Sequence, residues 1–334
     1  MAYEDHSIRC SRLTKHYRIK RREEGTLPAL MSLVKTHYET VTAIRDVEFA
    51  VAPGESVGLL GGNGAGKTTL LRMLTGVIAP TSGSINAAGH VPSDHEPAYL
   101  QDISLVMGQK SQLQWDIPVV ESFRLHQAIY NVNESDYRSR LVDFIDILGI
   151  EPYLSKPTRS LSLGERMRCE VAKSLLHAPR MLFLDEPTIG LDPDVQRQLR
   201  TYLRRYCQER GASLLLTSHN VRDIEELCPR VIALDKGAII YDGPFRGLIE
   251  QHGLSGRLNV SVAAADASTL ESCCVARGLA LENVGEGEYA ILIPETEFRP
   301  VLHWLSGEVA LLKMSRGESR TEDVVADLYQ QSGA

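Results

Sequence analysis

Residues 61–69 read Gly61-Gly62-Asn63-Gly64-Ala65-Gly66-Lys67-Thr68-Thr69 and match the pattern G-x-x-x-x-G-K-[ST]. In this pattern the backbone N–H groups of a glycine-rich loop surround phosphate oxygens at the positive end of a helix. The loop must therefore lie between a strand and a helix. Its flanks meet this requirement, because Ser56–Leu60 predicts a strand and Lys67–Leu74 predicts a helix. The sequence thus predicts a phosphate-binding loop.

Polar side chains in and beyond this loop predict the chemistry of the bound phosphates. Lys67 would bridge the β- and γ-phosphates of a nucleotide, and the Thr68 hydroxyl would be a ligand of Mg²⁺. Met181–Leu184 predicts a buried strand that ends at Asp185 and Glu186. Since adjacent strand residues point to opposite sides, we expect two different roles. Asp185 holds Mg²⁺ through water, and Glu186 polarises the water that attacks the γ-phosphate.

Strand and helix patterns alternate from about residue 45 to residue 245, which predicts an α/β fold around a sheet. The further expected strands are Ile103–Val106, Ser213–Thr217, Val231–Leu234 and Ala238–Tyr241. The further expected helices are Tyr137–Leu148, Gly164–Leu176, Asp194–Glu209 and Val221–Leu227.

The pattern changes after residue 252 and predicts a second, smaller domain. The expected elements, in order, are a strand at Leu258–Val262, a helix near Ser268–Arg277, strands near Leu279–Val284 and Tyr289–Ile293, a helix at residues 298–305 and a strand at Val309–Met314. The order βαββαβ is typical of a small ferredoxin-like α+β domain. The capping box Ser319-Arg320-Thr321-Glu322 predicts one final helix.

Length and composition limit the class of protein. A chain of 334 residues is long enough for about two domains. It has 36 Lys and Arg residues against 43 Asp and Glu residues and a net charge of -7, so nucleic acid is not expected as a partner. No apolar run approaches the roughly 18 residues of a membrane helix, and we expect no secretory signal at Met1–His6. A soluble, cytoplasmic protein is the resulting expectation.

Cysteine and histidine residues give no metal-binding pattern. The 6 cysteines and 10 histidines form no CxxC or HExxH motif. We therefore expect no protein-bound zinc, and we interpret the adjacent Cys273 and Cys274 as plain buried thiols.

A further motif carries a resemblance to a known family. Leu161-Ser162-Leu163-Gly164-Glu165 precedes an expected helix and lies upstream of the acidic strand. It resembles the LSGGQ signature of ATP-binding cassette (ABC) ATPases, and the other family motifs lie in the family's order over roughly residues 8–250. Gln109 resembles the Q-loop glutamine, and Gly190-Leu191-Asp192 resembles the D-loop. His219 resembles the switch histidine that contacts the γ-phosphate.

The signature departs from the family pattern at two positions. Leu163 stands at a glycine-type position, and Glu165 replaces glutamine. Function should survive, because Ser162 and the Gly164 N–H at a helix start make the main contacts to the γ-phosphate. In the family, the signature of one subunit closes the P-loop site of another. Because this chain carries both halves of such a site, the resemblance implies a homodimer, with a heterodimer as the alternative.

The resemblance implies a set of site residues for ATP and Mg²⁺. The catalytic residues would be Glu186, His219 and Gln109. The ligands of Mg²⁺ would be Thr68, Gln109 and Asp185. The residues in contact with the nucleotide would be Gly61 to Thr69, Ser162, Gly164, Glu165 and Asp192.

An aromatic side chain after the first strand stacks on adenine in this family. Tyr17 has the usual strand-end context, and Tyr38 has the usual distance ahead of Lys67, because an insertion lies between the two tyrosines. Both remain candidates, and we favour Tyr17.

The insertion covers residues 18–40. It begins with Arg18, Lys20, Arg21 and Arg22 and continues with an amphipathic helix pattern at Leu27, Leu30, Met31 and Val34. One interpretation is a solvated excursion with a packed face. The other is a segment that lies against anionic headgroups or a membrane partner. Similar insertions occur in ATPases of polysaccharide-exporting ABC transporters.

The longer likeness is closest to ATPase subunits of ABC-2-type exporters. It is carried by Met107-Gly108-Gln109-Lys110, Trp115-Asp116, Phe123-Arg124-Leu125 and the signature. It implies a peripheral ATPase at the cytoplasmic face of the inner or plasma membrane that drives a separate permease. We expect the permease-facing surface just after Gln109, at Gln112, Trp115, Asp116 and Phe123.

The expected domains are an ABC ATP-binding domain at residues 1–252 and an accessory α+β domain at residues 253–334. A helical subdomain is expected at about residues 110–178. The alternative function is a soluble ABC ATPase that acts on ribosomes or DNA. Such proteins usually carry a second cassette with a basic linker or a long coiled coil, and this sequence has neither.

Overall fold

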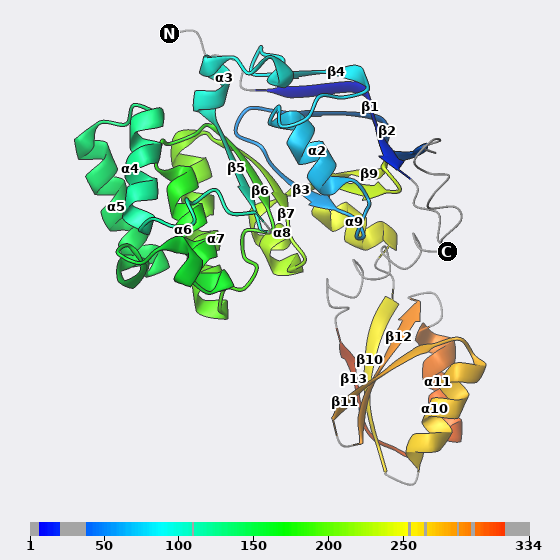
Figure 1. Ribbon diagram of the computed structural model, residues 1–334. Helices are drawn as coiled ribbons and strands as arrows, with labels where there is room; N and C mark the ends of the chain where they lie inside the picture. Colours follow the sequence, from blue (N-terminus) through cyan, green and yellow to red (C-terminus); the bar gives the residue numbers. More distant parts are fainter. Residues whose placement is uncertain are drawn as a thin grey trace, which may run out of the picture. The chain divides into compact units, whose positions relative to one another are not determined.

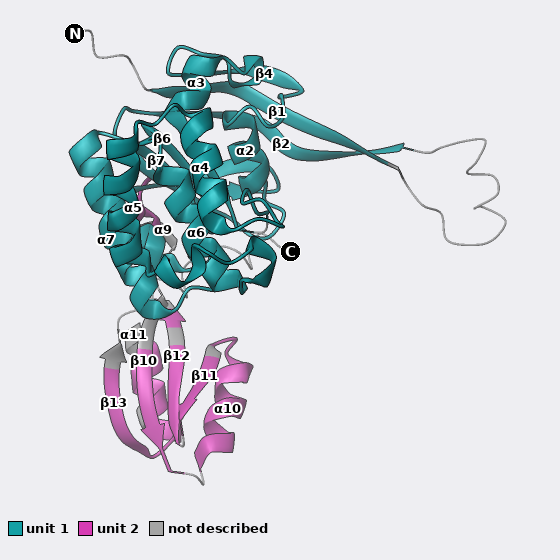
Figure 2. Ribbon diagram, turned by 60° about the vertical axis from the view of Figure 1, so that its left-hand side comes forward, with its two compact units in different colours: residues 1–242 teal, residues 243–334 magenta. Residues whose placement is uncertain are grey.

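The computed structural model of the chain describes residues 7–20, 38–108, 110–252, 255–263, 266–285, 287–294 and 298–317. The chain divides into two compact units, residues 1–242 and residues 243–334 (Figure 2). Among the described residues, no helix combines the length and the apolar character that crossing a bilayer requires.

In the described part of the first unit, six strands form a central sheet with the order β5-β6-β7-β3-β8-β9 (Figure 1). The strands are β3 (Ser56–Leu60), β5 (Ile103–Met107), β6 (Met181–Asp185), β7 (Ser213–Thr217), β8 (Arg230–Asp235) and β9 (Ala238–Pro244). Strands β5, β6, β7, β3 and β8 run parallel to one another. All residues of β6 and β7 are buried, which explains the continuous apolar runs of these central strands. Every strand that the sequence predicts in this region is present.

The parallel arrangement brings several loops to one edge of the sheet. The carboxyl ends of β3, β5, β6 and β7 all lie at this edge, because the four strands run in the same direction. Ligands of open α/β sheets bind at the carboxyl ends of the strands. The glycine-rich loop follows β3, Glu186 follows β6, and Ser218 and His219 follow β7.

A second, antiparallel sheet of the first unit has the order β2-β1-β4 among the described residues. Its strands are β1 (Ile8–Lys20), β2 (Tyr38–Val51) and β4 (Ser82–Ala87). Their buried side chains, including Ile8, Leu13 and Ile44, share one hydrophobic core with β3 and with helix α2 (Lys67–Leu74). The two sheets and α2 therefore form one packed body.

Strands β1 and β2 extend into the insertion expected at residues 18–40. Arg18 pairs with Thr40, and Lys20 pairs with Tyr38. Both ends of the insertion are therefore continuations of a β-hairpin. Arg21, Arg22 and the expected amphipathic helix lie outside the described residues.

The remaining helices of the first unit are α3 (Pro97–Asp102), α4 (Val119–Ile129), α5 (Glu134–Leu148), α6 (Leu163–Leu175), α7 (Pro193–Arg210) and α8 (Val221–Leu227). Helix α6 contacts α4, α5 and β5, and these helices lie together beside the sheet in Figure 1. Helices α3 and α4 are not among the predicted helices. The first turn of α4 holds Val119 and Val120, and β-branched residues have a low helix propensity. Burial of Val119 and Phe123 stabilises α4 instead.

The second unit begins with α9 (Phe245–His252) and continues in the predicted order βαββαβ. Its elements are β10 (Ser255–Val262), α10 (Ala267–Ala276), β11 (Ala280–Gly285), β12 (Glu288–Pro294), α11 (Phe298–Glu308) and β13 (Leu311–Gly317). Antiparallel pairing gives the strand order β11-β12-β10-β13. Leu270 of α10 and Leu305 of α11 share a core with β10 and β12, so both helices cover one face of this sheet (Figure 1). The helix expected from Ser319 onward lies outside the described residues.

The cysteines lie mainly in the interior. Cys274 and four others are buried, and Cys273 is half-buried. Within the described residues, no three His, Cys, Asp or Glu side chains form a group that could hold a metal ion on their own.

Candidate functional site

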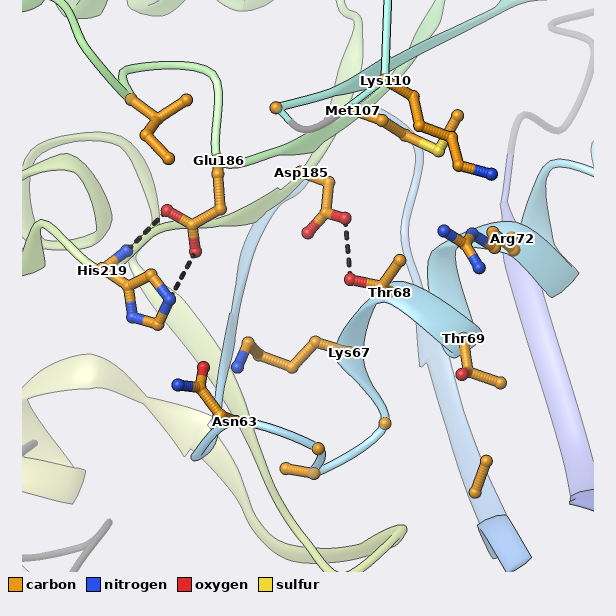
Figure 3. A pocket seen from close by; sticks show the side chains of 16 residues that line it. Asn63, Lys67, Thr68, Thr69, Arg72, Met107, Lys110, Asp185, Glu186 and His219 are labelled. Carbon is orange, nitrogen blue, oxygen red and sulfur yellow. Dashed lines mark hydrogen bonds and ion pairs between the residues drawn. The ribbon is translucent and has the colours of Figure 1, made fainter. Parts of the chain in front are cut away.

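A cleft of about 390 Å³ lies at the carboxyl edge of the central sheet (Figure 3). The predicted site residues that line it are Asn63, Gly64, Ala65, Gly66, Lys67, Thr68, Thr69, Asp185, Glu186 and His219. Ala43, Arg72, Met107, Gly108, Lys110 and Ile189 complete the lining. The structure therefore brings together the glycine-rich loop, the acidic strand end and the histidine, which are far apart in sequence.

The backbone of the glycine-rich loop requires its glycines. Gly66 has a φ of 108°, and a Cβ at this position would lie 2.6 Å from the carbonyl oxygen of Ala43. Helix α2 starts directly after Gly66 without a side-chain cap. The first N–H groups of α2 are thus available to a ligand, and such groups at a helix N-terminus favour an anion.

Lys67 is the first residue of α2, and its side chain reaches back to the loop. Its Nζ donates to the carbonyl oxygens of Gly61 at 2.6 Å and Gly62 at 3.0 Å. Burial lowers the pKa of Lys67, whereas the carboxylates of Glu186 and Asp185 raise it. A phosphate group would offer the same ammonium a charged partner.

Oxygen atoms suited to Mg²⁺ meet at the end of β6. Thr68 Oγ1 donates to Asp185 Oδ2 at 2.8 Å, as Figure 3 shows, and Thr217 Oγ1 donates to Asp185 Oδ1 at 2.6 Å. Asp185 is buried, and hydroxyl and carboxylate oxygens are the ligands that Mg²⁺ prefers. The donor set therefore fits this metal. Gln109, the third expected ligand, lies outside the described residues.

Glu186 and His219 lie next to each other on one side of the cleft (Figure 3). The His219 backbone N–H donates to Glu186 Oε2 at 3.0 Å, and His219 Nε2 lies 3.5 Å from Glu186 Oε1. Burial raises the pKa of Glu186, and the contacts with His219 oppose this rise. A carboxylate whose pKa is raised is a better proton acceptor than an ordinary one.

The backbone at Glu186 is unusual for a residue with a side chain. Its φ is 58°, and a left-handed conformation of a non-glycine residue costs on the order of 1–3 kcal/mol. The N–H of Glu186 donates to Thr217 O at 3.1 Å, which ties the residue to β7. Surrounding structure thus holds the Glu186 side chain toward the cleft.

The signature-like segment lies at the start of α6, and its side chains are not among those that line the cleft. Ser162 and Glu165 form a reciprocal capping box, with Ser162 N donating to Glu165 Oε2 at 2.7 Å and Glu165 N donating to Ser162 Oγ at 3.3 Å. The backbone N–H of Ser162 lowers the pKa of Glu165. Glutamate closes this capping box as glutamine could, and its negative charge is in addition favourable at a helix N-terminus.

Gly164 and Asp192 connect this helix start to the D-loop-like segment. A Cβ on Gly164 would lie 2.3 Å from the carbonyl oxygen of Gly190, so only glycine allows this approach. Asp192 caps α7 by accepting from Val195 N at 3.1 Å, and it forms an ion pair with Arg168 of α6. The hydrogen bond from Val195 N lowers the pKa of Asp192.

Neither tyrosine considered for adenine stacking is among the residues that line the cleft. The ring of Tyr17 is half-buried and has Lys15 Nζ at 5.5 Å from its centroid. Tyr38 is 57% exposed, with the Arg18 guanidinium 4.9 Å from its ring centroid. Tyr17 stays the favoured prediction.

The segment after residue 109 differs in part from the expected permease-facing surface. Phe123 has no exposed surface, so its place in that surface was predicted wrongly; it anchors α4 instead. Trp115 is 54% exposed, and Asp116 is exposed beside Arg159. Gln112 Nε2 donates to Leu105 O at 2.5 Å, which leaves the side chain engaged within the chain.

A buried network that the sequence did not indicate supports the loops of Glu186 and His219. Thr188 Oγ1 and Ser218 Oγ each donate to Asp223 Oδ2 at 2.6 Å, and Arg200 Nη1 donates to Asp223 Oδ1 at 2.8 Å. Asp223 has no exposed surface. Thr188 follows Glu186 by two positions, and Ser218 directly precedes His219. Asp223 therefore joins the two loops that carry Glu186 and His219.

The fold and this site define a nucleoside triphosphatase of the P-loop class. Residues 44–189 match the family model described as ABC transporter. The ABC transporter ATP-binding protein NatA of Bacillus subtilis is 31% identical over 212 residues, which cover 64% of this chain and 86% of that protein. The Nod factor export ATP-binding protein I of Ralstonia nicotianae is 33% identical over 226 residues, which cover 67% of this chain and 70% of that protein.

Solved structures share the fold. An ATP-binding subunit of an ABC transporter superposes with a TM-score of 0.61 at 23% identity, over 79% of this chain and 98% of that one. A dimeric ATP-binding cassette bound to ADP and Pi superposes with a TM-score of 0.59 at 21% identity, over 71% of this chain and 98% of that one. This chain belongs to the family of ABC transporter ATP-binding proteins. The predictions of that family and of an ATPase are confirmed.

Proposed function

We propose that this chain is the ATP-hydrolysing subunit of an ABC-2-type exporter. Relatives named for Nod factor export and for linearmycin resistance support the exporter class. The chain would act as a peripheral subunit at the cytoplasmic face of the inner or plasma membrane and drive a separate multi-span permease. The observation that carries the ATPase mechanism is the cleft in which Lys67, Asp185, Glu186 and His219 converge.

The first step is binding of the phosphate chain. The N–H groups at the start of α2 and the ammonium of Lys67 bind the β- and γ-phosphates, because both present positive charge to the cleft. Thr68 and Asp185 hold Mg²⁺, which neutralises phosphate charge when bound. Tyr17 stacks on adenine in this proposal.

Glu186 and His219 act on the attacking water. Glu186 orients the water and accepts its proton. The water oxygen then forms a bond to the γ-phosphorus, while the bond from that phosphorus to the bridging oxygen breaks and releases ADP and phosphate. His219, held by its contacts with Glu186, orients the γ-phosphate and stabilises its charge.

A second copy of the chain completes each site. Ser162, Gly164, Glu165 and Asp192 lie outside the cleft of their own chain, yet the N-terminus of α6 is suited to an anion. In a symmetric dimer, this helix start closes the cleft of the other subunit. The dimeric cassettes among the structural neighbours have the same fold and support this arrangement.

A mixed-subunit experiment tests the composite site. Lys67→Ala and Ser162→Arg chains are each expected to be inactive, and a mixture is expected to regain activity. With random pairing, half of the dimers are mixed and each has one intact site of two. Activity should therefore return to at most about a quarter of the wild-type rate, the value for independent sites. Phosphate release by the mixture is the measurement. If the mixture stays inactive although both chains bind each other, the composite site is wrong.

The pH dependence of hydrolysis tests the role of Glu186. Only the carboxylate accepts a proton, and burial raises its pKa. The rate should therefore fall on the acidic side at a higher pH than an ordinary glutamate would give. The measurement is kcat at saturating MgATP against pH, with circular dichroism as the control for folding. The residual rate of Glu186→Gln should lack this acidic decrease; an unchanged decrease would assign it to another group.

A further inference from the structure

Glu170 holds the segment that follows the cleft wall. Its Oε1 accepts three hydrogen bonds from consecutive residues: Ser111 Oγ at 2.5 Å, Gln112 N at 2.7 Å and Leu113 N at 3.1 Å. Glu170 lies on α6 and is 5% exposed. A buried carboxylate with three donors is a strong attachment, because hydrogen bonds to a charged acceptor are stronger than those between neutral groups.

A second residue of α6 reinforces this attachment. Lys173 Nζ donates to Gln112 O at 3.0 Å, and burial lowers the pKa of Lys173. Residues 111–113 are therefore bound to α6 at both their N–H and C=O groups. We call Glu170, Lys173 and residues 111–113 the α6 clamp.

The clamp begins where the nucleotide cleft ends. Met107, Gly108 and Lys110 line the cleft, and Gly108 N donates to Asp185 O at 2.8 Å. Ser111 directly follows Lys110. One wall of the cleft is thus connected within a few residues to Glu170, on the helix that starts at Ser162.

We propose that Glu170 is a positioning residue that couples the two nucleotide sites of the dimer. The inference rests on the proposed function, in which the start of α6 contacts the nucleotide of the partner. A change in the wall of one cleft moves residues 111–113, the clamp moves α6 with them, and Ser162 and Gly164 change their position at the other cleft. Energetic coupling between sites requires a contiguous set of contacts of this kind.

The hydrogen bonds of Glu170 indicate that it attaches residues 111–113 to α6 and does not only fill space in the core. Every hydrogen bond that the structure describes for its carboxylate goes to residues 111–113. An apolar side chain would occupy the same site without this attachment. Removal of the carboxylate should therefore free the segment from α6, while the capping box at Ser162 and the glycine-rich loop keep their own contacts.

The test measures ATP hydrolysis by the full-length chain as a function of ATP concentration. With two coupled sites, the wild-type Hill coefficient should approach about 2, and Glu170→Ala should lower it to about 1. ATP affinity, measured without turnover, should stay within about twofold. Glu170→Gln should restore the cooperativity, because the amide oxygen can accept the same hydrogen bonds. Glu151→Ala, which removes an exposed carboxylate shortly after α5, is the control.

Ser111→Ala provides a milder variant if Glu170→Ala fails to fold. It removes one of the three hydrogen bonds and should lower the Hill coefficient in part. A Glu170→Ala protein that loses rate but stays as cooperative as the wild type would overturn the role of Glu170 alone. A wild-type protein that hydrolyses ATP without cooperativity would overturn the coupling, whereas the two-site dimer is decided separately by the mixed-subunit experiment.

Discussion

Glu186→Gln is expected to lower the rate of ATP hydrolysis by about 10²- to 10⁴-fold, which is the usual contribution of a general base. Glutamine has the size of glutamate and can still accept the N–H of His219, which donates to Glu186 Oε2 at 3.0 Å. It cannot take the proton of the attacking water. The variant should therefore bind ATP with wild-type affinity and accumulate as a nucleotide-bound dimer. Phosphate release, equilibrium ATP binding and molecular mass in solution are the three measurements.

Two comparisons make this experiment specific. Glu225→Gln changes an exposed carboxylate on the nearby α8 and should leave the rate unchanged. Lys67→Ala should weaken ATP binding itself, because it removes a charge-assisted contact to phosphate. Near-wild-type turnover by Glu186→Gln would assign the proton to another acceptor and would contradict the proposed mechanism.

The sequence predicts those parts of the site whose residues form a recognisable motif within a short stretch of the chain. The glycine-rich loop needs particular backbone angles at residues that are close in the chain, such as the φ of 108° at Gly66. Asp185 and Glu186 end an apolar strand, and parallel pairing of β6 with β5 and β7 then places them at the carboxyl edge of the sheet. Short-range patterns of this kind are therefore sufficient for the main features of the fold and of the cleft.

The residues that the sequence did not indicate act through contacts between distant segments. Glu170 is hydrogen-bonded to residues 111–113, which are 57 to 59 positions away in sequence. The sequence next to Glu170 is that of an ordinary amphipathic helix and does not indicate these contacts. Thr217 looks like the last residue of an apolar strand, although its hydroxyl supports Asp185. Phe123 is the reverse case. The likeness to exporter ATPases placed it on an exposed surface, but its side chain is buried in the structure. Only tertiary structure decides between such alternatives.

Arg200→Met is expected to lower the free energy of unfolding by about 3–5 kcal/mol, the usual cost of removing one partner from a buried ion pair. Arg200 is 6% exposed and donates to the fully buried Asp223 at 2.8 Å. Methionine fills much of the same space but leaves the charge of Asp223 without its ionic partner. Arg200 also lies 3.1 Å from Glu226, but that carboxylate is 38% exposed and stays hydrated. Urea denaturation of the full chain measures the loss.

The same helix supplies the matched control for this variant. Arg197→Met removes an ion pair to Asp194 in which both side chains are mostly exposed, and such pairs contribute about 0–1 kcal/mol. Equal losses from Arg200→Met and Arg197→Met would show that burial of the Asp223 pair has no special cost.

The double variant Arg200→Met with Asp223→Asn separates the unpaired charge from the lost packing. Asparagine is neutral and still offers an oxygen to Thr188 and Ser218, so most of the stability should return, and the two substitutions should be strongly non-additive. Because Thr188 and Ser218 belong to the loops that carry Glu186 and His219, ATP hydrolysis should recover along with stability. A double variant that is stable but inactive would instead show that the negative charge of Asp223 is itself needed to hold the two catalytic loops in place.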